Sequence, residues 1–299
     1  MKTTSGGGYC IGGEVALTGA RVEVAGDIDA HGNGGASDQA IVVTATETDV
    51  VVSGSSVLNA NGVGQPDGYG SDGGGVVLYA PLGNVVASGS SITAWGKSPY
   101  GSGGSLVVAA GQNATIDTRV TIQGGSNGIG GELDAESGGS MTISDDILAT
   151  GGTLAPYGGG GSVVVLSEGP ILVTSIIDAS ALAGGDITVD SASTTTISGT
   201  LNTHGSRWVG GSVDVTGCSV SVTGTLDAAA SNGGIGGYVD LEAGAISIGA
   251  TGRLLAADCG FDDCVALSTA GAPPTIHPNA VISPTPALFV EPEFPTCGS

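Results

Sequence analysis

The chain has 299 residues, of which 57 are glycine, 40% are hydrophobic and only 11% are charged. This composition excludes a disordered segment, and glycine without a strict three-residue period excludes collagen. With 28 acidic against 6 basic side chains the formal net charge is −22, so we expect no nucleic acid partner, and no apolar run is long enough for membrane insertion.

Gly-Gly pairs divide the chain into units of similar length. They begin at residues 12, 34, 74, 103, 130, 160, 184, 210 and 236, and the intervals between them run from 22 to 40 residues. Most pairs are followed by three short segments in which apolar residues alternate with small or polar ones. Such alternation predicts short strands that each turn one face to a core.

The first unit reads GGEVALTG at 12–19, ARVEVAG at 20–26 and DIDAHG at 27–32. Later units keep this order, for example from GGSVDVTG at 210–217 onwards. Three strands per unit of about 22 to 30 residues predict one coil of a right-handed parallel β-helix, whereas the left-handed hexapeptide form needs a stricter period of about 18. We therefore predict an all-β solenoid of eight or nine coils over residues 10–264.

Residues 265–299 are rich in proline and interrupt the repeat pattern. Because proline lacks the N–H that a central strand needs, we expect no central strands here. An open end of a solenoid needs a cover, so the segment is interpreted as a C-terminal cap. A flexible extension is the alternative interpretation.

Sequence insertions collect after the third strand of each unit, which predicts long loops on one edge of the solenoid. Aromatic and basic residues gather in or beside these loops: Tyr69, Trp95, Lys97, Tyr100, Tyr157, Arg207 and Trp208. An exposed aromatic strip with polar neighbours is typical of sugar stacking or protein contact. Alternatively, the rings pack on each other and stiffen the loops.

Two columns of polar residues are expected beside these loops. His204 aligns with unrelated residue types in other units, including Asn61 and Trp95, which indicates a stacked, solvent-facing position rather than a catalytic imidazole. The column two residues earlier is mainly Asp, Asn and Thr: Asp29, Asn59, Thr93, Thr121, Asp178, Asn202 and Asp227. We interpret it as a hydrogen-bonding ladder between coils and predict no catalytic residue. The carboxylate pair of a glycoside hydrolase would have to face across a cleft.

Asp67 and Asp72 share one Gly-rich loop and are the candidate ligands of a single Ca²⁺ ion. The alternative is a hydrated acidic loop, because the nonapeptide calcium repeat does not recur in tandem. No other cofactor is expected. Basic residues are too few and too scattered to favour a polysaccharide lyase.

The five cysteines favour disulfides and an extracellular or cell-surface location. Cys259 and Cys264 have the spacing of a small disulfide loop, and neither a nearby histidine nor a second cysteine pair completes a zinc site. The odd number leaves one thiol unpaired or bonded to another chain.

Taken as a pattern, the units resemble the Gly-rich right-handed β-helices of bacterial surface adhesins, autotransporter passengers and filamentous-haemagglutinin-like exoproteins, over about residues 10–260. Two departures are the lack of a signal-peptide apolar segment near residue 1 and the cysteine content. The resemblance implies a non-enzymatic structural or adhesive surface protein, as a segment of a larger exoprotein or of a fibre. The alternative is a carbohydrate-active β-helix that binds or cleaves polysaccharide at the aromatic loop edge. Expected partners are polysaccharide, another surface protein or a second copy of the chain.

Overall fold

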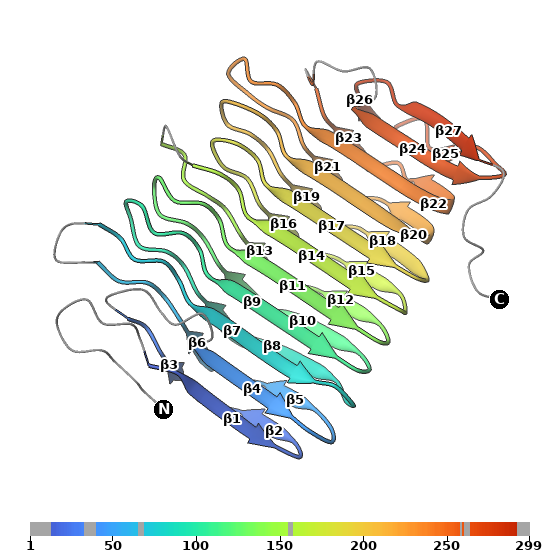
Figure 1. Ribbon diagram of the computed structural model, residues 1–299. Helices are drawn as coiled ribbons and strands as arrows, with labels where there is room; N and C mark the ends of the chain where they lie inside the picture. The colour runs from blue at the N-terminus through green and yellow to red at the C-terminus, as the bar shows by residue number, and fades with distance from the viewer. Residues whose placement is uncertain are drawn as a thin grey trace.

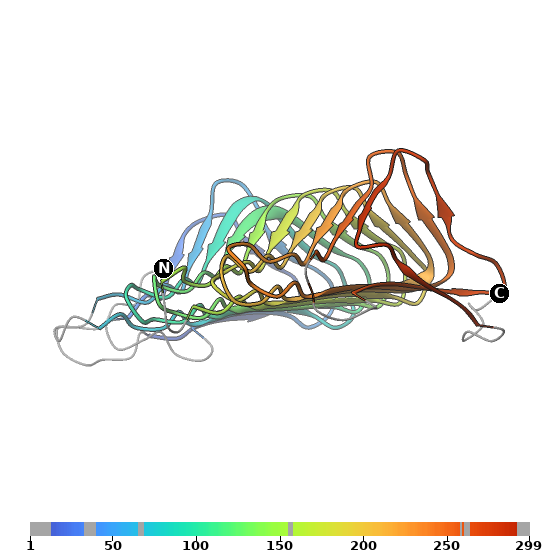
Figure 2. The same ribbon diagram turned by 90° about the horizontal axis from the view of Figure 1, so that it is seen from above.

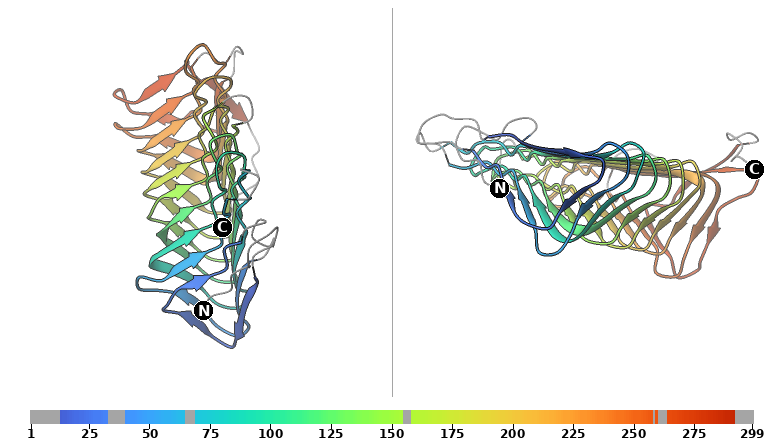
Figure 3. Two further views of the ribbon diagram at one scale, coloured as in Figure 1. Left: turned by 90° about the vertical axis from the view of Figure 1, so that its left-hand side faces the viewer. Right: turned by 90° about the horizontal axis from the view of Figure 1, so that it is seen from below.

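The computed structural model describes residues 13–32, 40–64, 69–154, 158–257, 259 and 264–291. These residues form 27 short β-strands and no helix, and the strands pair in parallel with those of the next turn (Figure 1). The result is a β-solenoid of about nine turns, which confirms the predicted all-β parallel fold. Figures 2 and 3 show the turns stacked along one axis, with the first and last strands at opposite ends.

The strands make three ladders along the axis. The first ladder consists of β1 (Val15–Gly19), β4 (Ile41–Ala45), β7 (Gly75–Ala80), β9 (Ser105–Ala110), β11 (Glu132–Ser137), β14 (Ser162–Ser167), β17 (Asp186–Ser191), the first halves of β20 (Ser212–Val222) and β22 (Tyr238–Ile248), β24 (Val265–Ala270) and β27 (Ala287–Glu291). The second consists of β2 (Val22–Val24), β5 (Val50–Val52), the first parts of β8 (Val85–Thr93) and β10 (Ala114–Thr121), β12 (Met141–Ile143), β15 (Ile171–Val173), β18 (Thr194–Ile197), the second halves of β20 and β22, and β25 (Thr275–Ile276). The third consists of β3 (Ile28–Asp29), β6 (Val57–Asn59), the ends of β8 and β10, β13 (Ile147–Leu148), β16 (Ile176–Asp178), β19 (Thr200–Asn202), β21 (Thr225–Asp227), β23 (Arg253–Leu255) and β26 (Val281–Ser283).

Alternation along each strand builds the core. In β11, Leu133 and Ala135 are buried while Asp134 and Glu136 are exposed. Parallel pairing keeps like positions in register from coil to coil, so the inward side chains form continuous apolar columns. Burial of these columns is the main favourable contribution to folding.

Close stacking of the coils explains the Gly-Gly pairs. The N–H of Gly210 donates to Ile235 O of the next coil (2.8 Å), and the N–H of Gly211 donates to Thr203 O of its own coil (2.8 Å). A Cβ atom on Gly210 would overlap Ala228 O, and one on Gly211 would overlap Gly185 O. Any side chain here would therefore push neighbouring coils apart.

A column of polar side chains supports the turn between the first and the second strand of each coil. Asp49 Oδ1 accepts hydrogen bonds from the backbone N and side-chain Nδ2 of Asn84 (2.8 and 2.9 Å). Asn84 Oδ1 in turn accepts from Asn113, and Asn113 Oδ1 accepts from Ser140. The hydrogen bonds from Asn84, first from its backbone N–H, lower the pKa of the Asp49 carboxyl.

The expectation that residues 265–299 contain no central strand is wrong, because the described part of this segment forms another coil. Strand β24 lies between β22 and β27 and pairs with both in register, so it is a central strand of the first ladder. β25 and β26 extend the other two ladders. The prolines at 273, 274, 278, 284 and 286 all lie between these strands, where a missing N–H removes no ladder hydrogen bond.

We expect Gly211→Ala to lower the free energy of unfolding by about 1–3 kcal/mol or more, because the new methyl group forces a backbone shift between coils. Gly26→Ala is the matched control, since nothing lies within 4 Å of a Cβ at Gly26 and its φ is ordinary. The control should be neutral or stabilising by less than about 1 kcal/mol. Urea unfolding followed by circular dichroism checks both; equal effects would contradict the stacking explanation.

Candidate functional site

The candidate site is the loop face. We define it as the described residues of the loops between the third ladder and the next Gly-Gly pair, in the ranges 60–73, 94–103, 122–130, 149–160, 179–184, 203–210 and 228–236. The second glycine of each pair closes the neck of its loop: Gly104 N donates to Ala94 O (2.6 Å), and Gly131 N donates to Ile122 O (2.7 Å). The loops therefore project from the same edge of the solenoid (Figure 1).

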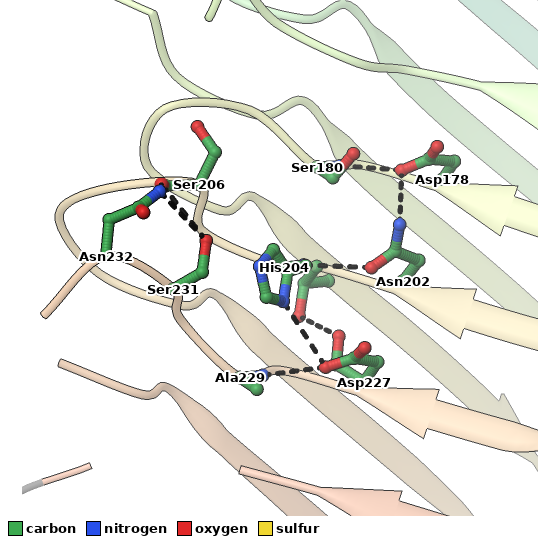
Figure 4. A network of polar contacts seen from close by, with 10 residues as sticks. Asp178, Ser180, Asn202, His204, Ser206, Asp227, Ala229, Ser231 and Asn232 are labelled. Carbon is green, nitrogen blue, oxygen red and sulfur yellow. Dashed lines mark hydrogen bonds and ion pairs between the residues drawn. The ribbon is translucent and has the colours of Figure 1, made fainter. Parts of the chain in front are cut away.

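The predicted polar ladder lies at the base of this face. Asp178, Asn202 and Asp227 occupy one column in register. The side-chain oxygen of each accepts a hydrogen bond from the backbone N–H two residues later, at Ser180, His204 and Ala229 respectively (2.9, 3.1 and 2.9 Å) (Figure 4). This is an Asx turn, which sets the direction in which the chain leaves the strand.

Amides link the ladder between coils. Asn202 Nδ2 donates to Asp178 Oδ1 (3.0 Å), and Asn59 Nδ2 donates to Asp29 Oδ1 (3.1 Å) in the same way near the other end of the solenoid. The Asn202 side chain thus donates to a carboxylate in the preceding coil through Nδ2, while its Oδ1 accepts the N–H of the Asx turn in its own coil. The predicted hydrogen bonding between coils is therefore confirmed for Asn59 with Asp29 and for Asn202 with Asp178.

His204 of the loop face and His31, which lies two residues after β3, each lie beside an aspartate. His204 Nδ1 lies 3.7 Å from Asp227 Oδ1 of the next coil, and His31 Nδ1 contacts Asp29 Oδ1 of its own coil. His204 lines an open recess of about 480 Å³ together with Thr150, Asn202 and Asp227. The recess is bordered by hydroxyl and amide groups, which suits a polar ligand.

A second recess, of about 340 Å³, lies closer to the N-terminal end of the face. It is lined by His31, Asn59, Asn61, Trp95 and Lys97, together with residues 62–64. The backbone of Trp95 is anchored to the preceding coil, because its N–H donates to Asn61 Oδ1 (2.9 Å). Lys97 Nζ lies 5.2 Å from the centroid of the Trp95 ring, within the range of a cation–π contact. We call this the Trp95 recess.

The structure brings four of the predicted binding residues into two pairs. Trp95 and Lys97 line one recess, and Tyr69 and Tyr100 from adjacent loops have ring centroids 5.5 Å apart. The two tyrosines remain 56% and 46% exposed, so their contact leaves ring surface available to a ligand.

The other predicted binding residues are separate from these two pairs. Arg207 and Trp208 are exposed on loop 203–210, four coils further along, which is roughly 19 Å at about 4.8 Å per coil. Tyr157 lies outside the described residues. Trp208 adjoins Val209, which pairs with the exposed Ile235 of the next coil. Sequence analysis did not single out these two apolar residues, although both directly precede a Gly-Gly pair.

The calcium prediction is not tested by the structure. Asp67 lies outside the described residues, and Asp72 Oδ1 accepts the backbone N–H of Ser102 (2.6 Å). Within the described part of the chain, no three His, Cys, Asp or Glu side chains are grouped as a metal site requires. The predicted disulfide between Cys259 and Cys264 is present, with Cα atoms 6.1 Å apart.

A larger recess of about 630 Å³ lies away from the loops, on the outer side of the first ladder. Tyr79 and Leu166 line it together with Glu136, Glu168 and Asp190. No basic side chain contributes to its lining, so it is unsuited to an anionic ligand.

Two carboxyl groups missed in the sequence also lie on the outer side of the first ladder. Asp214 in β20 and Asp240 in β22 face each other in register. Burial, followed by the charges of Asp240 and Asp186, raises the pKa of Asp214, and burial raises the pKa of Asp240. Asp240 Oδ1 is buried without a hydrogen-bond partner. The signal was present, since GGSVDVTG and GGYVDLEA put aspartate at the same outward position.

We expect Asp240→Asn to raise the melting temperature at pH 7, because ionised Asp240 is partly buried beside another carboxylate. A raised pKa means that the folded protein binds the proton more tightly, so the penalty is full above the folded pKa. It disappears as the pH falls toward the unfolded value of about 3.9. The advantage of the variant should therefore shrink between pH 7 and pH 4.

Asp134→Asn is the control, since Asp134 is exposed in the same column between Val107 and Val164. Differential scanning calorimetry over this pH range measures both variants. A pH-independent gain, or the same gain in the control, would show that the pair is not under electrostatic strain.

Comparisons with protein-family models, curated proteins and solved structures found no match for this chain. In the part of the chain that the structure describes, there is no helix that could cross a membrane.

Proposed function

We propose that this chain is a non-enzymatic, extracellular structural and adhesive protein whose loop face binds polysaccharide. The observation that carries the proposal is the Trp95 recess, where an indole ring, two asparagines, a histidine and a lysine converge. Sugars present C–H groups on one ring face and hydroxyl groups around the edge. An aromatic side chain with polar neighbours matches both kinds of surface.

A long ligand fits the geometry of the loop face better than a small one. The recess at Trp95 and the recess at His204 lie on the same edge of the solenoid, and both are open. Coils repeat at about 4.8 Å along the axis, so a polymer lying parallel to the axis passes Asp29 and Asn59 and then Asp178, Asn202 and Asp227 in successive coils. Weak contacts that repeat along one chain add up to useful avidity.

The carboxylates of the loop face support binding rather than catalysis. A glycoside hydrolase on this face would use Asp178 and Asp227, which lie two coils apart, or roughly 9.6 Å, near the upper limit for inverting enzymes. Both side chains already accept the N–H of an Asx turn. They also lie in one column of a single ladder, instead of on opposite walls of a cleft.

An extracellular location is supported by the Cys259–Cys264 disulfide, because disulfides persist in oxidising compartments. The high negative charge is compatible with a soluble surface protein that avoids non-specific association. The stacked coils provide a stiff support, which suits a structural role.

We expect Trp95→Ala to weaken polysaccharide binding by about 30-fold, equivalent to about 2 kcal/mol, as loss of an anchoring aromatic does at other interfaces. Tyr79→Ala is the matched control, since Tyr79 is a 43% exposed aromatic in the first ladder, away from the loops. Isothermal titration calorimetry against neutral and acidic polysaccharides measures the change. The control should bind as the wild type does.

Assays for reducing ends on the same panel test the absence of catalysis. We expect no turnover. Turnover that is lost in Asp227→Asn would replace the binding proposal with a hydrolase, and wild-type protein that binds no polysaccharide would refute the ligand class.

A further inference from the structure

The apolar core is covered along its length and partly exposed at its two ends. Inward side chains of the central coils are almost fully buried; Leu106, Ile143 and Val189 are each 0% exposed. The partly buried apolar residues that pack against this core are confined to the first and last coils: Leu17, Val22, Ile276, Ala280 and Ile282. Both ends therefore leave core surface available for packing.

Among the apolar side chains that face the core, those of the last strand are the most exposed. Leu288 in β27 continues the inward column of Leu267, yet Leu288 is 52% exposed whereas Leu267 is 0% exposed. Val290 on the same strand is 49% exposed. Among the described strands none pairs with the outer edge of β25, β26 or β27. An apolar strand with a free edge is a template for pairing with another strand.

The opposite end offers a matching surface. Within the described residues, β1 pairs only with β4 of the second coil. Leu17 begins the inward column that Leu288 ends, because parallel register connects them through every coil of the first ladder. The two ends also lie far apart on the same axis (Figure 1).

We infer that a second copy of this chain docks end to end, with its β1 added beside β27 and its Leu17 packed on Leu288. In the first ladder the interface continues the strand-on-strand packing that already joins each turn to the next, whereas within the described residues the second and third ladders end one turn earlier, at β25 and β26. A parallel strand with the same inward column is what the free edge of β27 accepts, and β1 of the same chain supplies it. The contact is head-to-tail, so each added copy leaves one free end and the assembly is open-ended.

Charge opposes this association. Two copies that each carry a formal charge of −22 repel each other, and the repulsion weakens when salt shortens the Debye length below about 8 Å. We therefore expect association to increase between about 0.15 M and about 0.5 M salt. Charge pairing across the interface would give the opposite salt dependence.

Sedimentation velocity of the full chain over a concentration series tests the inference. The wild type should form progressively larger species, and Leu288→Lys and Leu17→Lys should each remain monomeric. Each variant keeps one intact end, so an equal mixture of the two should form dimers and nothing larger. Leu82→Lys is the control, because Leu82 is 63% exposed in the turn between β7 and β8, away from both ends.

Circular dichroism melts check that the variants are folded, and Leu288→Asn provides a milder change at the same contact. A wild type that stays monomeric at both salt concentrations would overturn the inference, as would a mixture of the two Lys variants that fails to dimerise. Loss of association in Leu82→Lys would also overturn it. None of these outcomes depends on whether the loop face binds polysaccharide.

Discussion

The structure depends on the close approach of successive coils. Parallel strands stack at about 4.8 Å, and the chain can keep this spacing at the loop necks only where no Cβ intervenes. Gly210 and Gly211 show the reason, since a methyl group on either would overlap a carbonyl oxygen of a neighbouring coil. Both glycines also donate N–H groups that hold the neck closed. This Gly-Gly pair therefore reflects a packing requirement.

Regular stacking also explains what the surface can do. In the ladders each side chain lies beside others in a column, so a partly buried polar residue either finds a partner in the adjacent coil or destabilises the fold. Asn202 compensates Asp178 and keeps its own turn, whereas Asp240 faces Asp214 and both groups have a raised pKa. Only the loops escape this constraint, and there the chain places Trp95, Lys97 and Tyr100. Recognition is therefore expected on the loop face.

The sequence predicts the ladders well because alternation and the Gly-Gly period are local signals, as the columns of Asp29 and His204 illustrate. The sequence does not predict which residues of different coils adjoin, because that depends on the strand register. The pairing of Asp214 with Asp240 and of Val209 with Ile235 requires knowing which coils adjoin. The proline content of residues 265–299 does not reveal the coil that begins at Val265, because the prolines up to residue 286 lie between the strands and leave the ladder hydrogen bonds intact. The separation of Trp208 from Trp95 depends on how many coils intervene.

Trp95 is the proposed centre of polysaccharide binding, and the chain has only two tryptophans. In a Trp208→Phe variant the tryptophan fluorescence comes from Trp95 alone. Titration with a panel of neutral and acidic polysaccharides measures contact with that ring directly. We predict a saturable change in emission with at least one polysaccharide, and its absence in free monosaccharides at the same sugar concentration. An emission spectrum that no polysaccharide alters, from a variant that melts like the wild type, would contradict the account.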